Sequence, residues 1–176
     1  MRYSFVFVIL CSIIGLIACE TKDTTRKASQ YKGPLIEITN VNAFYSDSGK
    51  VKVNLRTPLQ QEYKNEDRVF PKGLTVNFYD AQLQNNGRLV ADSAFYSKKE
   101  KLWTAVGNVV VTNLLENKSL LSDTLHWNTT KKIFYTSAPI KITSPKDNLA
   151  GKGIEAQQDL KRYQIGQPKG IITVKQ

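Results

Sequence analysis

Histidine and cysteine are scarce in this chain of 176 residues, which contains one histidine and two cysteines. So few side chains exclude a multi-histidine zinc site, and two thiols exclude a disulfide-rich scaffold. Motifs for phosphate binding and for a serine nucleophile are missing too. Neither Gly49-Lys50 nor Gly151-Lys152 is followed by Ser or Thr, and no G-x-S-x-G occurs. The sequence therefore predicts a protein that is not an enzyme and that needs no metal or other cofactor.

Negative charge is also in short supply, because 15 Asp and Glu residues stand against 25 Lys and Arg residues. The formal net charge of +10 suits an anionic partner, such as nucleic acid, an acidic membrane surface or a phosphorylated ligand. The choice among these partners depends on the compartment in which the protein works.

The N-terminal segment is typical of an exported protein. Residues 1–18 contain one charge, Arg2, and an apolar run shorter than the roughly 20 residues of a membrane-spanning helix. The run ends in Leu16-Ile17-Ala18-Cys19, the lipobox pattern of bacterial lipoproteins, in which small residues admit a peptidase and the thiol receives the lipid. We expect a lipoprotein signal peptide at 1–18 and lipidation of Cys19. An ordinary signal peptide with an incidental cysteine is the alternative.

The polar stretch that follows predicts a tether rather than a folded element. Residues 20–32 lack apolar periodicity, and Gly33-Pro34 closes the stretch. We therefore expect a lipidated cysteine and flexible tether at 19–34 and one folded domain at 35–176. An exported, membrane-anchored domain rarely meets nucleic acid, so we expect no nucleic-acid partner.

The domain is predicted to be all-β. Apolar and polar residues alternate with a period of two in runs such as 51–55, 74–78, 109–111 and 140–142, which are rich in β-branched and aromatic residues. No segment keeps a helical apolar period, although residues 59–67 fit either a short helix or a polar loop. Asn85-Asn86-Gly87 predicts a hairpin turn, because Asn and Gly tolerate a positive φ.

A repeat emerges when the alternating positions are aligned. An apolar pair is followed, after six residues, by an aromatic residue and then by a second pair. The three copies, the last of which has two extra residues before its second pair, are Ala94/Tyr96–Trp103–Val109/Val111, Leu125/Trp127–Phe134–Ile140/Ile142 and Ile154/Ala156–Tyr163–Ile171/Thr173. Each unit of about thirty residues predicts two strands and a turn. Constant spacing keeps each pair on one face, so stacked copies give a continuous apolar face.

The turns inside these units are basic, and stacking would bring them to one rim. Their residues are Lys98, Lys99 and Lys101, then Lys131 and Lys132, then Lys161 and Arg162. Lysines at exposed turns commonly keep β proteins soluble. The alternative is a rim that faces the phosphates of a bound ligand.

Four segments carry a resemblance to a known family. They are LVADSAFY at 89–96, GNVVV at 107–111, LSDTLHW at 121–127 and AGKGIEA at 150–156. With the export signal they resemble the LptC family, the periplasmic component of the lipopolysaccharide export machinery. The A-D-x-A-x-Y … G-N-V-x-V pattern is shared with LptA and with the N-terminal domain of LptD. The lipid anchor and the single short domain favour LptC.

The resemblance implies a fold and a role. The fold is an open, V-shaped β-jellyroll of antiparallel strands, with lipopolysaccharide acyl chains in its apolar crease. The role is a relay that accepts lipopolysaccharide from the inner-membrane ABC transporter and passes it to an LptA-like periplasmic protein by pairing of strand edges. We expect the free edge at Ile171, Ile172, Thr173 and Val174.

The anchor departs from the family pattern, because family members commonly hold the membrane by a transmembrane helix and this chain has a lipobox. We expect the anchored protein to lie on the periplasmic side of the inner membrane. The outer membrane is the alternative, because the retention signal for the inner membrane in enteric bacteria is an Asp after the lipidated Cys, and Glu20 stands at that position here.

The candidates for the acyl-chain groove are the alternating apolar residues of the strands. They are Leu74, Val76, Phe78, Ala94, Tyr96, Val109, Val111, Leu125, Trp127, Ile140, Ile142 and Ile154. Packing between two sheets is the simpler explanation for such faces, and in an open jellyroll one crease serves both purposes. Trp127 is the first candidate, and its neighbour His126 is expected on the opposite face. For Asp92 and Asp123 we expect hydrogen bonds at turns or strand ends.

A different function remains open at this point. A surface-exposed β-sandwich lipoprotein would bind glycans or a protein, with Tyr79, Trp103 and Tyr163 as platforms on its outer face.

Overall fold

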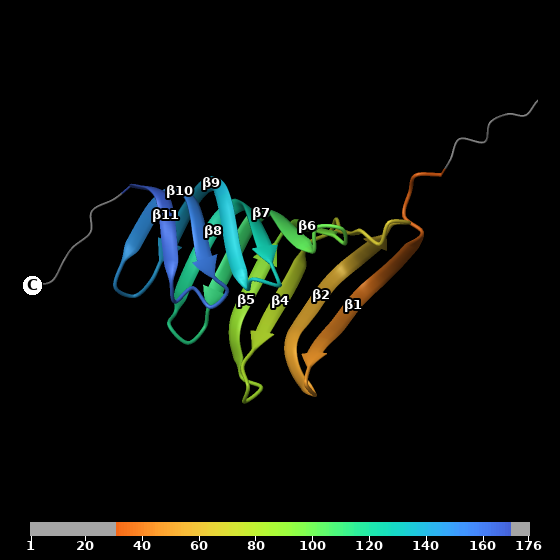
Figure 1. Cartoon of the computed structure of the whole chain (residues 1–176), viewed down its shortest axis with the longest axis horizontal. Coiled ribbons are helices and arrows are strands. Elements are labelled where there is room, and N and C mark those ends of the chain that lie inside the picture. Colours follow the sequence, from red (N-terminus) through yellow and green to blue (C-terminus); the bar gives the residue numbers. More distant parts are fainter. Residues whose placement is uncertain (1–30, 170–176) are drawn as a thin grey trace, which may run out of the picture. The chain divides into compact units, whose positions relative to one another are not determined.

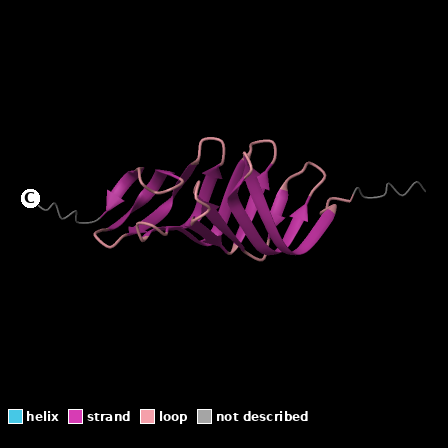
Figure 2. Cartoon of the chain, turned by 90° about the horizontal axis from the view of Figure 1, so that it is seen from below, coloured by secondary structure: helices cyan, strands magenta, loops and turns pink. Residues whose placement is uncertain are grey.

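The computed structural model describes residues 31–169 of the chain, which form strands joined by turns and contain no helix (Figures 1 and 2). The predicted all-β class is therefore confirmed. The strands are β1 (Ile36–Asp47), β2 (Lys50–Glu62), β3 (Arg68–Phe70), β4 (Leu74–Tyr79), β5 (Asn85–Ala91), β6 (Ser93–Ser97), β7 (Leu102–Asn113), β8 (Lys118–Asn128), β9 (Ile133–Thr143), β10 (Asn148–Gln157) and β11 (Tyr163–Lys169).

Several sequence predictions fall outside this part of the chain. The signal peptide, Cys19, most of the tether and the edge residues 171–174 are not described, so each stays a prediction. The strands belong to one compact unit that begins at Gly33. Within the described residues, no helix is long and apolar enough to cross a membrane.

All strand pairs are antiparallel and belong to one eleven-stranded sheet, in which β1 and β11 are the outermost strands (Figure 1). Two long strands, β2 and β7, each pair with two short strands along one edge. β2 pairs with β4 through residues 53–56 and with β3 through residues 61–62. β7 pairs with β6 through residues 102–106 and with β5 through residues 110–113. Because β3 also pairs with β6 and β4 with β5, these six strands close a ring of pairings. The sheet therefore folds over into two layers.

A line of bends marks the fold between the layers. Strand registers shift between Val106 and Val109 in β7, between Ser122 and His126 in β8 and between Lys152 and Ile154 in β10. Such bulges bend a strand and increase its twist.

The bend in β7 has a clear physical cause. Gly107 has a φ of 78° and lies so close to Asp92 that a Cβ would stand 2.8 Å from the Asp92 carboxylate. The Asn108 side-chain amide donates to that carboxylate at 2.7 Å. The main-chain N–H of Asp92 donates to the Gly107 carbonyl at 3.0 Å. Asp92, between β5 and β6, thus makes hydrogen bonds at the ends of strands, as predicted.

The layers are defined by these bends. The first layer contains β4 and β5 with residues 109–113, 118–122, 140–143 and 148–152. The second contains β3 and β6 with residues 102–106, 125–128, 133–136 and 154–157. Phe78 of the first layer meets Trp127 of the second edge-on at 5.3 Å between ring centroids, and Phe134 at 6.2 Å. Phe78 pairs with neither residue in the sheet, so the two layers face one another across an apolar core.

The predicted repeat corresponds to consecutive strand pairs, β6–β7, β8–β9 and β10–β11. Neighbouring units stack in register: Trp103 of the first unit is opposite Trp127 of the second, and within the second unit Trp127 is opposite Phe134. The stacking that the constant spacing predicted is therefore present across the described part of these units.

One local prediction was wrong, and another was right only in part. The turn between β4 and β5 lies at 80–84 rather than at Asn85-Asn86-Gly87, because the Asp80 carboxylate caps it by accepting from the N–H groups of Gln82 and Gln84, both at 2.9 Å. Gly87 lies within β5, where the Phe78 ring packs 3.3 Å from the position of a Cβ. Residues 59–67 were expected as a short helix or a polar loop; residues 59–62 instead continue β2, whereas residues 63–67 form a loop as predicted.

Candidate functional site

The twelve candidate groove residues share the inner faces of the two layers. Eleven of them are buried, and Tyr96 is partly buried and packs against the same core. Leu74, Val76 and Phe78 belong to the first layer, with Val109, Val111, Ile140 and Ile142. Ala94, Tyr96, Leu125, Trp127 and Ile154 belong to the second. We call the apolar space between these faces the trough; in this structure their own side chains fill it.

A chain of aromatic rings runs along the second layer of the trough. Trp103 stacks on Phe70 at 5.3 Å, lies 4.9 Å from Tyr96 and continues to Trp127 at 6.1 Å. Trp127 then meets Phe134 at 6.0 Å. Aromatic pairs at such distances add to the energy of burial, and flat rings present large apolar areas. The inner face of this layer is therefore part of the core and presents a row of large apolar rings.

These contacts overturn one expectation. Trp103 and Tyr163 were the proposed platforms on the outer face, yet both pack against the core on the inner side. Strand phase explains the result, because Trp103 is paired with the inner residue Trp127, and Tyr163 with the inner residue Ala156. Tyr79, the third platform, lines a cavity at the end of β4 instead.

The outer face of the second layer carries the single histidine. His126 Nδ1 lies 3.0 Å from Thr104 Oγ1, and its ring lies 5.0 Å from the Tyr135 ring. Its neighbour Trp127 is inside, so the predicted opposite orientation of this pair is confirmed. Three or more His, Cys, Asp or Glu side chains do not cluster as metal ligands anywhere in residues 31–169.

Sequence reasoning missed several inner residues, of which Leu120 is the clearest. Counting back in twos from Trp127 and Leu125 puts Leu121 inside, but Leu121 is 37% exposed and Leu120 is 0% exposed. The register shift in β8 after Ser122 changes the phase of the strand. In the sequence, the only sign of this change of phase was Asp123-Thr124, a polar pair that interrupts the apolar alternation of the strand. Phe70, Leu89 and Leu160 are further buried residues outside the predicted set.

One side of the trough, away from the bends, lies between two rows of turns. The first layer contributes the turns around 80–84, 114–117 and 144–147, and the second contributes those around 98–101, 129–132 and 158–162. We call this side the mouth. All seven predicted rim residues lie on or beside the turns of the second layer.

The rim residues differ in their partners. Lys98 Nζ donates to Glu66 at 2.6 Å. That contact raises the pKa of Lys98 above its usual value and lowers the pKa of Glu66. Arg162 donates to the side chain of Gln157. Lys131 and Lys132 line a cavity of about 450 Å³ at the mouth, with Phe78, Tyr79 and Ile133 among its walls. The phosphate-facing role of the rim stays a prediction.

A second, larger hollow of about 770 Å³ lies over another part of the sheet. Residues from β1, β2, β4 and β5 line it, including Arg56 and Val90, together with Lys72 from the turn before β4. In the sheet, Thr75 pairs with Arg56 on one side and with Val90 on the other. All three residues alternate with inner residues along their strands, so this hollow is on the outer face and is separate from the trough.

Comparison with protein families agrees with this geometry. Residues 4–167 match the model of the family described as lipopolysaccharide-assembly, LptC-related. The chain belongs to the LptC family. The LptC resemblance drawn from residues 89–156 is thereby confirmed. None of the curated proteins compared with the chain matches it. LptC proteins are non-enzymatic components of lipopolysaccharide transport on the periplasmic side of the inner membrane.

Proposed function

We propose that this LptC-family chain holds the acyl chains of lipopolysaccharide in the trough and relays the lipid through the transport bridge. The observation that supports this most is the continuous apolar inner face, which runs from β4 to β10 over both layers. Each exposed methylene costs about 0.8 kcal/mol in water, so a chain of about twelve carbons costs on the order of 10 kcal/mol. A carrier that covers the chains removes most of this cost.

Acyl chains can enter the trough without breaking the sheet. Phe78 meets Trp127 and Phe134 through ring contacts alone. Such apolar contacts are non-directional, and a lipid chain can replace them at little cost in free energy. Parting the layers around the bends therefore exchanges protein contacts for lipid contacts, while the strand hydrogen bonds within each layer persist.

The strand edges suit the predicted exchange of lipid between like domains. β1 is twelve residues long and, in the part that the structure describes, pairs only with β2. Ile36, Phe44 and Tyr45 on it are at least half exposed. An unpaired, apolar edge is suited to strand addition by a partner. We propose that edge pairing links the chain to the transporter and to an LptA-like protein, the latter at residues 171–174.

The anchor determines which edge faces the membrane. If Cys19 is lipidated, 16 residues lie between it and Ile36, the first residue of β1, a reach of at most about 60 Å. β1 is thus the edge that stays close to the membrane, where an inner-membrane ABC transporter delivers lipid. The C-terminal edge is free to pass it on. Mass spectrometry of the mature protein would test lipidation, and Cys19→Ser would abolish it.

Photo-crosslinking at two adjacent positions tests lipid binding in the trough. A photoreactive amino acid at Trp127 faces inward, and the same group at His126 faces outward next to Tyr135. We expect adducts with purified lipopolysaccharide from position 127 and few from position 126. Equal labelling at both positions, or labelling at 126 alone, would contradict binding in the trough.

The edge model has a separate test. Truncation of residues 170–176 should abolish capture of an LptA-like domain while leaving lipid adducts at position 127. Capture that survives the truncation would show that docking uses another surface. Trp103 and Tyr163 no longer support the outer-face function, because both pack against the core.

A further inference from the structure

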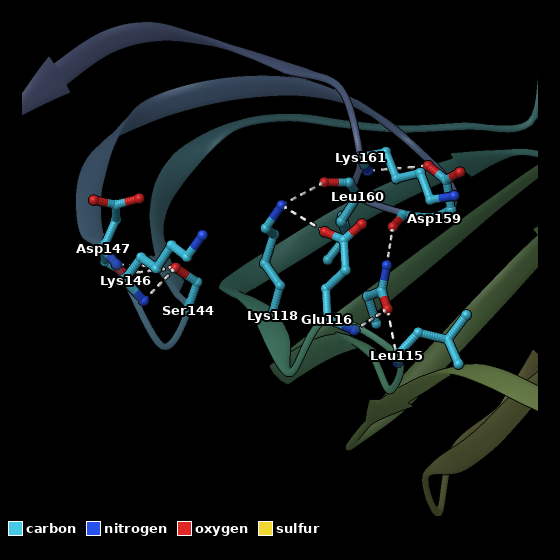
Figure 3. A network of polar contacts seen from close by, with 10 residues as sticks. Leu115, Glu116, Lys118, Ser144, Lys146, Asp147, Asp159, Leu160 and Lys161 are labelled. Atoms are coloured by element: carbon cyan, nitrogen blue, oxygen red, sulfur yellow. Dashed lines mark hydrogen bonds and ion pairs between the residues drawn. The ribbon is translucent and has the colours of Figure 1, made fainter.

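The turn at 157–162, between β10 and β11, crosses the mouth of the trough and is held by the opposite layer. The Asn113 side-chain amide, at the end of β7, donates to the Asp159 carbonyl at 2.7 Å. Lys118 Nζ, at the start of β8, donates to the Leu160 carbonyl at 3.4 Å and lies 5.6 Å from the centre of the Tyr163 ring. Figure 3 shows Lys118 reaching from the first layer toward Leu160 in this turn. We call residues 157–162 the latch.

Leu160 is the apolar plug of the latch. It is 1% exposed and belongs to the core cluster of the trough, although it comes from a turn rather than a strand. Its φ of 55° lies in the left-handed region, which is unfavourable for leucine. Strained turn residues persist only where surrounding contacts hold them, and they are concentrated at clamps and switch regions. The burial of Leu160 and the two donors from the first layer provide that hold.

The latch is also connected to the principal inner residue. Trp127 Nε1 donates to the side chain of Gln158 at 3.2 Å, and the main-chain N–H of Gln158 donates to the Lys132 carbonyl at 3.0 Å. Movement of the latch would therefore release a side chain that lines the trough. The same movement would open the turn that carries two of the rim lysines.

The cavity of about 450 Å³ lies directly beside the latch. Gln157, Gln158 and Asp159 form one wall of it, and Lys131 and Lys132 form another. Neither lysine makes an ion pair with any described residue. The Asp159 carboxylate is occupied in part, since it accepts from the N–H of Lys161 at 3.0 Å. Apolar walls from Phe78 and Ile133 beneath two unpaired cations match an amphiphile with an anionic head.

We propose that this cavity and the latch form a lateral entry site for a phosphorylated lipid. The phosphate lies against Lys131 and Lys132, and an acyl chain takes the place of Leu160 as the latch lifts. Lipid then enters through the mouth as well as from the strand edges. This inference rests on the proposed function, because it requires that lipid occupies the trough.

The rate at which the full chain takes up lipopolysaccharide with a fluorescent acyl label tests the proposal. Leu160→Ala should accelerate uptake about tenfold, a factor equal to about 1.4 kcal/mol and smaller than the usual cost of truncating a buried leucine. Leu83→Ala is the matched control, because Leu83 also lies in a turn with a φ of 64° but is 56% exposed. Its uptake rate should equal that of the wild type.

A second variant opens the latch without changing the core. Asn113→Asp keeps the oxygen that accepts from the N–H groups of Leu115 and Glu116, yet it loses the donor to Asp159. It should also accelerate uptake. Replacement of Lys131 and Lys132 by Gln should slow the uptake of the phosphorylated lipid and leave that of its dephosphorylated form unchanged.

The outcomes separate the two proposals. Wild-type rates for both Leu160→Ala and Asn113→Asp would overturn the entry site while leaving binding in the trough intact. Equal slowing of both lipids by the lysine replacement would overturn the phosphate contact. A wild-type chain that takes up no lipopolysaccharide would overturn the proposed function and the entry site together.

Discussion

Leu120 and Leu121 are consecutive residues of β8 that point to opposite faces of the first layer, and truncating each to Ala tests the bend between the layers. Leu120 is 0% exposed and its partner in the register is Val111, whereas Leu121 is 37% exposed. Uninterrupted alternation from Trp127 would exchange the two positions. Both variants make the same chemical change, Leu to Ala, on opposite faces of the strand. The variant that destabilises the fold more therefore shows whether β8 is bent or regular.

The expected magnitudes are well separated. Truncation of a fully buried leucine costs about 2.7–5.0 kcal/mol, because the transfer energy of the lost groups adds to that of the cavity. An exposed substitution usually costs less than about 1 kcal/mol. We therefore expect Leu120→Ala to lower the free energy of unfolding by about 3 kcal/mol. Leu121→Ala should lower it by a fraction of that amount.

Urea unfolding followed by tryptophan fluorescence measures both values. The chain has two tryptophans, and both pack in the trough, so their emission reports on the core. With a slope of about 2 kcal/mol per molar urea, Leu120→Ala should lower the midpoint by about 1.5 M. Equal midpoints for the two variants, or a larger loss for Leu121→Ala, would refute the change of phase at Asp123-Thr124.

Two further predictions concern the last strand and the rim. Gly151→Ala should loosen β11, because a Cβ there would stand 2.5 Å from Ile165 Cγ2 and 2.7 Å from the Gln167 carbonyl oxygen. We expect faster amide hydrogen exchange at residues 163–169, with exchange in β8 and β9 unchanged. Glu66→Gln should weaken folding slightly at neutral pH, since the contact with Lys98 lowers the pKa of Glu66 and favours its charged form in the folded state. That difference should vanish as the pH falls through the lowered pKa, and it should shrink in high salt because the pair is exposed; a difference that persists in acid would contradict this origin.

The sequence was informative wherever a strand stayed regular. Alternation within 74–78 and 140–142 placed Val76 and Ile142 on the inner face, and the constant spacing of the repeat placed Leu125 and Trp127 together on one face. These predictions succeeded because side chains alternate strictly in a pleated strand, and because a buried face demands apolar residues.

The failures arose where tertiary contacts change the local pattern. β8 changes phase between Ser122 and His126, where its register with β9 shifts, so Leu120 faces inward; a strict period of two does not predict such a change, and only the polar pair Asp123-Thr124 marked it. The Asp80 cap placed the turn at 80–84, directly before the predicted Asn85-Asn86-Gly87. Leu160 was missed because a lone leucine in a polar turn carries no periodicity, and its burial depends on Asn113 and Lys118 from the other layer.

Depletion of the chain in living cells tests the central claim, transport of lipopolysaccharide, most directly. The measurement is the fraction of newly made lipopolysaccharide that reaches the outer membrane, with the wild-type chain supplied in trans as the control. We expect newly made lipopolysaccharide to accumulate at the inner membrane on depletion, and delivery to recover on complementation. Normal delivery after complete removal of the chain, in a cell without a paralogue, would contradict the account.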